Sequence, residues 1–168
     1  MKINTSRFGE IEATESAMLL MKGVILGFER HSRYVLLTHD PNTPLWWLQS
    51  VDDPDLAFVV VDPWVVKPDY DPAIDEEDLA FLHIQDRKDM ILLAIVTVRS
   101  HPFRLTANLR APILVHATGR TANQVILNDP AHPIQYDVIA NRTADTGLPE
   151  GCGGTEGPGR LAVSATPA

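Results

Sequence analysis

The sequence predicts a mainly β fold: an antiparallel sandwich or small barrel with one or two short helices and a disordered C-terminal tail. Short runs rich in Val, Ile, Leu and aromatic residues recur along the chain, separated by Pro, Gly, Asn and Asp, as in strands joined by turns. Apolar residues make up 45% of the 168 residues, enough for one core. Six of the ten glycines fall in the last 22 residues, which favours a tail without a core of its own.

Nine runs are expected to form strands, because each is short, apolar or alternating, and bounded by turn residues. They cover residues 2–5, 9–12, 34–38, 46–50, 57–62, 91–98, 105–109, 113–117 and 124–127. The run AFVVVDP is apolar on both faces, as in a central strand that is covered on both sides. Pro63 is expected to end this strand, since proline cannot donate to a ladder of hydrogen bonds.

One helix has a clear start signal. Asp75 can cap the stretch EEDLAFLHI, and three acidic residues follow it in the first turn, where the positive end of the helix dipole lies. Leu79 and Leu82 are spaced to share a buried side, with Phe81 beside them. The helix is short, so packing must stabilise it.

The predicted organisation is a single folded domain over residues 1–140 and a flexible, Gly- and Pro-rich tail over residues 141–168. No run of 18 apolar residues occurs, and the N-terminus lacks the apolar stretch of a secretory signal. Cys152 is the only cysteine and excludes an internal disulfide. We therefore expect a cytoplasmic protein without a membrane association.

The charge is negative and unevenly distributed. The formal net charge is −8, and the segment from Asp52 to Asp89 contains twelve acidic residues but only three basic ones. Such a surface repels phosphate backbones and attracts basic partners. Direct binding to nucleic acid is therefore not expected.

Signals for catalysis are weak. The six histidines show no metal-binding spacing, and neither a nucleophile elbow nor a phosphate-binding glycine loop occurs. We expect no enzyme and no cofactor or metal. One alternative stays open, a small hydrolase that uses Asp52, Asp53 or His101 with a divalent ion. Adjacent acids in the sequence DDPD are more typical of turns, where their side chains bond nearby backbone N–H groups.

A longer pattern identifies a resemblance. The stretch WLQSVDDPDLAFVVVDP (residues 47–63) resembles the signature of the flagellar assembly factor FliW family. MKINTSRFGEIE, KGVILGFE, RYVLL, PDYDPAI, TANLRAPILV and QVILND follow the family's order and spacing. The resemblance covers about residues 2–129 and implies a compact, predominantly antiparallel β-barrel-like domain without enzymatic activity.

The resemblance also implies two protein partners. FliW proteins bind flagellin in the cytoplasm before export, and alternatively bind CsrA, a small dimeric RNA-binding translational repressor. When FliW binds CsrA, it prevents CsrA from silencing flagellin mRNA. Secreted flagellin releases FliW, so flagellin synthesis is coupled to flagellin secretion.

Two docking surfaces are hypothesised from these implications. The first is an acidic surface that attracts basic CsrA and repels its RNA. It would comprise Asp69, Glu76, Glu77 and Asp78. The second is a groove for a helical, apolar terminal segment of flagellin. Its candidate lining is Leu48, Val51, Phe58 and Leu109, each of which could instead be ordinary core. Polar turn or rim groups complete the candidate partner-binding residues: Gln49, Ser50, Asp52, Asp53, Thr106 and Asn108.

Overall fold

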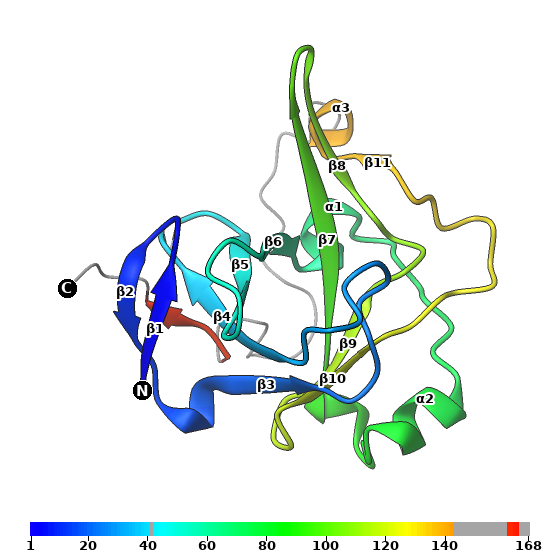
Figure 1. Ribbon diagram of the computed structural model, residues 1–168. Coiled ribbons are helices and arrows are strands. Elements are labelled where there is room, and N and C mark those ends of the chain that lie inside the picture. Colours follow the sequence, from blue (N-terminus) through cyan, green and yellow to red (C-terminus); the bar gives the residue numbers. More distant parts are fainter. Residues whose placement is uncertain (41, 143–160, 165–168) are drawn as a thin grey trace.

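Figure 1 shows a computed structural model of the chain, which describes residues 1–40, 42–142 and 161–164. The strands are β1 (Lys2–Thr5), β2 (Gly9–Glu12), β3 (Met18–Met21), β4 (Arg33–Thr38), β5 (Leu45–Ser50), β6 (Ala57–Val61), β7 (Met90–Ser100), β8 (Phe103–Ala107), β9 (Ile113–His116), β10 (Thr121–Gln124), β11 (Tyr136–Asp137) and β12 (Val163–Ser164). The helices are α1 (Pro63–Val66), α2 (Glu76–Phe81) and α3 (Val138–Arg142), with 3-10 turns at Glu15–Ala17 and Arg87–Asp89. The mainly β fold is confirmed, and the described residues form three short helices where one or two were expected.

The main sheet closes on itself. Pairings run from β7 through β6, β5, β4, β3 and β10 to β9, and β9 pairs again with β7. The long strand β7 makes this closure possible, because its first half pairs with β9 and its second half with β6 and β8. Within this ring every pairing is antiparallel except that of β10 with β3. The barrel-like expectation therefore corresponds to a ring of paired strands.

Both faces of the ring strand β4 are buried. On β4, Tyr34 and Leu36 pack into one hydrophobic cluster, whereas Val35 and Leu37 pack into another. The alternation follows from the period of two along a strand. The first cluster also takes residues from β3, β5, β7, β9 and β10, while the β1–β2 hairpin covers the second. A third cluster lies between the sheet and the helices.

The predicted helix is present as α2, which begins after Asp75. Leu79 and Leu82 are buried as expected, at 5% and 0% exposure. Two details differ: the Asp75 side chain makes no capping hydrogen bond, and Phe81 is 47% exposed rather than packed beside the leucines. At 100° per residue, a position between two buried neighbours three apart faces away from the core.

Helix α1 was missed by the sequence analysis. Pro63 ends β6 as expected, but it also starts a helical turn, because Asp62 accepts a hydrogen bond from the backbone N of Trp64 at 2.9 Å. An aspartate cap followed by proline at the first position is a recognised start signal. Helix α3 begins similarly, since Asp137 accepts hydrogen bonds from Ile139 N and Ala140 N at 3.0 Å each.

The strand predictions differ from the structure at several places, among them the strand expected at 105–109, which is β8 at Phe103–Ala107. β3 was missed, and so were the two-residue strands β11 and β12. The strand expected at 124–127 is shifted, since β10 is Thr121–Gln124. Residues beyond Gln124 still alternate, with Val125 and Leu127 buried and Ile126 exposed, but they bond only to the carbonyl oxygens of Pro112 and Arg110. They are extended without forming a regular ladder.

Most of the predicted tail, including Cys152, lies outside the described residues. Its described part packs on the body: β12 pairs in parallel with β4, and Leu161 is buried in the cluster that contains Tyr34. The described residues 161–164 of the segment expected to be a disordered tail are therefore packed on the body. Buried apolar side chains and ladder hydrogen bonds are what order such a segment.

Candidate functional site

A buried glutamine organises the loop that joins β5 to β6. Gln49 is fully buried, and its Nε2 lies 3.1 Å from the carbonyl oxygen of Asp53 and 3.0 Å from that of Leu56. The carbonyl oxygens of Ser50 and Pro54 lie 3.1 and 3.3 Å from the same nitrogen. Because Nε2 carries two protons, these acceptors share them. The carbonyl oxygens of the loop therefore surround a single side-chain amide group, that of Gln49.

Short polar bonds complete this loop. Ser50 Oγ accepts from the backbone N of Asp52 at 3.2 Å and of Asp53 at 3.1 Å. Asp53 Oδ1 accepts from Asp55 N at 3.0 Å. Asp52 forms an ion pair with the guanidinium of Arg33, whose Nε lies 3.2 Å from Oδ2. The turn interpretation is therefore confirmed for Ser50 and Asp53, and Arg33 offsets the charge of Asp52.

The four candidate groove residues do not line one groove. Leu48 and Leu109 are buried, at 1% and 0% exposure, in two different hydrophobic clusters. Phe58 is partly buried against the cluster of Leu48, and Val51 packs against the cluster of Val35 and Leu37 under the β1–β2 hairpin. The core interpretation applies to Leu48 and Leu109, so the groove expected from these residues is wrong. Strand alternation alone did not separate buried from docking positions.

Thr106 and Asn108 flank the end of β8. Thr106 pairs with Thr97 on one side and Asp137 on the other. Asn108 Oδ1 accepts from the backbone N of Arg110 at 3.1 Å and of Ala111 at 3.0 Å. Asn108 is therefore a turn residue, as its polar character suggested.

The acidic residues fall into two groups. The loop with Asp52 and Asp53 lies against the β1–β2 hairpin, as the 3.0 Å bond from Ser6 N to Pro54 O places it. The second group, on and before α2, lies on the other side of the molecule (Figure 1). Acidic residues that are close together in the sequence thus lie in two separate parts of the structure.

The α2 group carries the denser charge. Lys67 pairs with Asp69 at 2.7 Å and Arg87 with Glu76 at 3.3 Å, both at the surface. Burial, with the nearby charges of Asp75 and Glu77, raises the pKa of Asp78. A carboxyl crowded by like charges is stabilised by an approaching cation. This group, called the acidic end below, comprises Asp69, Asp71, Asp75, Glu76, Glu77 and Asp78.

An apolar cavity of about 130 Å³ lies between α1, α3 and the base of the β7–β8 hairpin. Its walls include Leu45 of β5, Val65 of α1, Val96 of β7, Leu105 of β8 and Val138 of α3. None of these residues was a candidate in the sequence analysis. The cap at Asp62 followed by Pro63 was the signal that could have placed α1, and with it Val65, beside the sheet.

The structure does not support a metal-dependent hydrolase. Asp52 and Asp53 belong to the β5–β6 loop, whereas His101 lies in the turn between β7 and β8. Within the described ranges, no group of three His, Cys, Asp or Glu side chains is arranged to hold a metal ion. The residues named for that alternative do not converge. Among these same residues, no helix is long and apolar enough to cross a membrane.

Comparison with known proteins identifies one family. The family model described as "FliW protein" matches residues 2–138. A protein of Syntrophus aciditrophicus named "Flagellar assembly factor FliW" is 48% identical over 142 residues, which cover 84% of this chain and 90% of that protein. A protein of Caldanaerobacter subterraneus with the same name is 37% identical and covers 83% of this chain and 93% of its own length.

A solved structure agrees with these sequence matches. The crystal structure of the flagellar assembly factor FliW superimposes with a TM-score of 0.75 at 33% sequence identity. The alignment covers 82% of this chain and 96% of that one. The match of the family model to residues 2–138 spans the strand ring and the segments that form the acidic end and the apolar cavity.

Proposed function

The chain belongs to the FliW family of flagellar assembly factors, and from that premise we propose that it binds flagellin in the cytoplasm and antagonises the translational repressor CsrA. The observation that carries the proposal is the family match over residues 2–138, with 48% identity to a flagellar assembly factor. In this proposal the chain acts by binding other proteins and catalyses no reaction.

The acidic end supports the CsrA part of the proposal. Glu77 and Asp78 of α2 have no basic partner among the ion pairs of the described residues, and the pKa of Asp78 is raised by burial and by neighbouring carboxylates. A repressor that binds RNA presents cations. Docking them here relieves the crowding of like charges and places negative potential beside the RNA path.

A competition experiment tests the antagonism. Labelled flagellin leader RNA is bound to CsrA, and the chain is added while the bound RNA is followed by a gel-shift assay. We expect the chain to release the RNA, and added flagellin to restore the RNA complex by sequestering the chain. If the RNA stays bound at a large excess of the chain, the proposed antagonism is wrong.

Charge reversal tests the location. The variant Glu77→Lys with Asp78→Lys is expected to weaken CsrA binding and to reduce the dependence of the affinity on salt, because surface charges act within a Debye length of about 8 Å at physiological salt. The variant Glu12→Lys with Glu15→Lys is the matched control, since both acids are exposed and lie before β3. Equal loss in both variants would show that only net charge matters.

A further inference from the structure

The β7–β8 hairpin projects from the body of the molecule (Figure 1). Two apolar side chains on it are exposed: Val98 at 50% and Phe103 at 63%. Exposed apolar residues scattered singly are ordinary, whereas contiguous ones mark interaction sites. The question is therefore whether Val98 and Phe103 belong to one surface.

Strand register places them on one face. Val98 pairs with Leu105, and Phe103 pairs with Ser100. Residues two apart along a strand, and directly paired residues, share a face. Val98 and Phe103 are thus on the face that carries Val96 and Leu105, both of which line the apolar cavity.

An apolar surface therefore continues from the cavity to the tip of the hairpin. We call it the hairpin face, and it comprises Leu45, Val65, Val96, Val98, Phe103 and Leu105. Ser100 lies four residue steps beyond Val96 on β7, which at 3.4 Å per residue makes the hairpin part of the strip roughly 14 Å long. Two to three turns of an α-helix, at 5.4 Å per turn, match this length.

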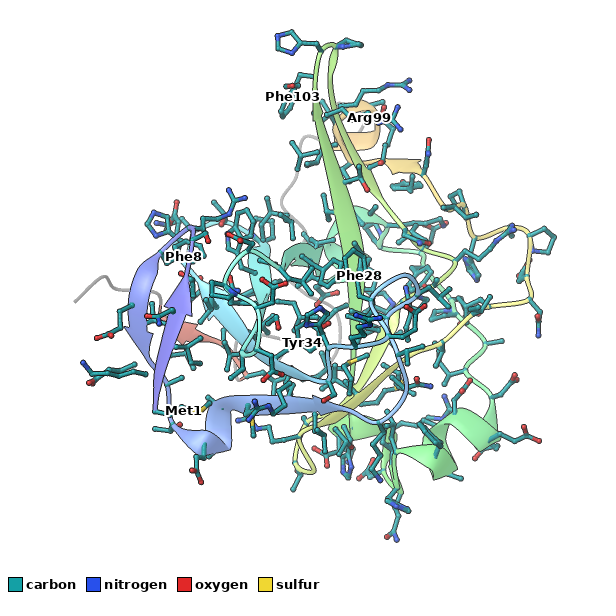
Figure 2. The ribbon with its side chains drawn as sticks, in the orientation of Figure 1. Met1, Phe8, Phe28, Tyr34, Arg99 and Phe103 are labelled. Atoms are coloured by element: carbon teal, nitrogen blue, oxygen red, sulfur yellow. The ribbon has the colours of Figure 1, made fainter. Side chains whose placement is uncertain are left out.

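The opposite face of the same hairpin is basic. Arg99 and Arg104 lie directly opposite each other, and neither has a carboxylate partner among the described residues. Figure 2 shows Phe103 and Arg99 on opposite sides of the hairpin. Like charges directly opposite on a sheet are destabilising. Two unpaired arginines in a chain of net charge −8 are therefore suited to an acidic partner.

Both arginines can reach a partner that lies on the apolar side. The pairing of β7 with β6 ends at Val96, so the outer edge of β7 is unpaired from there to the tip of the hairpin. The pairing of β8 with β11 ends at Thr106, so the outer edge of β8 is likewise unpaired toward the tip. A helix is wider than a two-stranded ribbon, so its flanks overhang both edges. A long arginine side chain can extend around each edge to a carboxylate on the flank.

We propose that the hairpin face docks an amphipathic helix whose apolar stripe is flanked by carboxylates. Charge complementarity favours this occupant over a basic protein, which the acidic end suits instead. Resting on the proposed function, the inference assigns the helix to flagellin and separates the flagellin surface from the CsrA surface. The two contact surfaces are then distinct, so the displacement of CsrA by flagellin that the competition experiment expects requires coupling between the two surfaces.

The test measures binding of purified monomeric flagellin to the full chain by calorimetry. Phe103→Ser and Val98→Ser are each expected to weaken binding about tenfold, as truncation of a buried apolar anchor does. Arg99→Glu with Arg104→Glu is expected to weaken it further and to reduce its salt dependence. Matched controls are Ile126→Ser, which removes an equally exposed apolar residue, and Arg30→Glu, which reverses an exposed charge outside the hairpin.

CsrA binding and sedimentation of the chain alone are measured with the same variants. The inference is supported if flagellin affinity falls in the hairpin variants only and CsrA affinity does not change. It is overturned if flagellin binds them as tightly as the parent chain, if they lose CsrA instead, or if Phe103→Ser dissociates a dimer of the chain. If the parent chain itself does not bind flagellin, the proposed function fails as well.

Discussion

Replacing Gln49 by methionine tests the idea that one amide holds the β5–β6 loop. Methionine has a similar volume but cannot donate, so the loop carbonyl oxygens that lie 3.0–3.3 Å from Nε2 lose their donor. The family signature runs through this loop, so its geometry also matters for the proposed function.

The magnitude follows from the number of bonds lost. Nε2 has two protons, and each hydrogen bond contributes about 1 kcal/mol net, with about 1 kcal/mol or more added for each buried carbonyl left unsatisfied. Part of this is offset, because Gln49 Oε1 is buried without a hydrogen-bond partner among the described residues and is removed too. We expect a loss of about 2–3 kcal/mol in the free energy of unfolding, or a decrease in Tm of roughly 4–12 °C.

Urea unfolding followed by tryptophan fluorescence measures the effect. Gln135→Met is the matched control, because Gln135 is exposed and a surface substitution changes stability by less than about 0.5 kcal/mol. If Gln49→Met unfolds within about 0.5 kcal/mol of the parent chain, the amide does not hold the loop and the argument from its hydrogen bonds is wrong.

Three further predictions concern stability. Leu109→Ala is expected to lower the free energy of unfolding by about 3 kcal/mol, because Leu109 is fully buried. A decrease below about 1 kcal/mol in urea unfolding would contradict its core role. Asp62→Ala is expected to cost about 1 kcal/mol by removing the cap of α1, whereas Asp62→Asn, which can still accept from Trp64 N, should cost less in the same assay. The third concerns pH: burial alone would raise the pKa of Asp89, but bonds from Thr118 and the charge of His116 lower it below 3.8. Above its usual pKa, the ionised carboxylate of Asp89 therefore stabilises the fold. This stabilisation is lost as the pH falls through the lowered pKa. Urea midpoints at pH 7 and pH 3 should differ less for Asp89→Asn than for the parent chain, and equal differences would contradict the pairing.

The sequence predicted elements where local and global preferences agree. Residues 57–61, AFVVV, are β-branched or aromatic at four of five positions, and they form β6. β3 was missed because Met18–Met21 contains only Met and Leu, which favour helices. Pairing with β4 and β10 makes this segment a strand, and such long-range pairing is not visible in a local window.

The turn chemistry of the site was predicted more successfully than its surfaces. Ser50, Asp53 and Asn108 bond to backbone N–H groups two or three residues away, and short-range bonds of this kind follow from local sequence. The apolar cavity takes its lining from α1, α3 and four strands between Leu45 and Val138. A site assembled from segments so far apart depends on the tertiary fold.

Closure of the strand ring has a consequence for synthesis on the ribosome. β3 leaves the tunnel early, but its parallel partner β10 is translated about one hundred residues later, and β9 must also return to β7. Until then the nascent chain carries free β-edges that can template aggregation. Truncation before residue 121 should therefore yield insoluble product, whatever the quality of the strands already made.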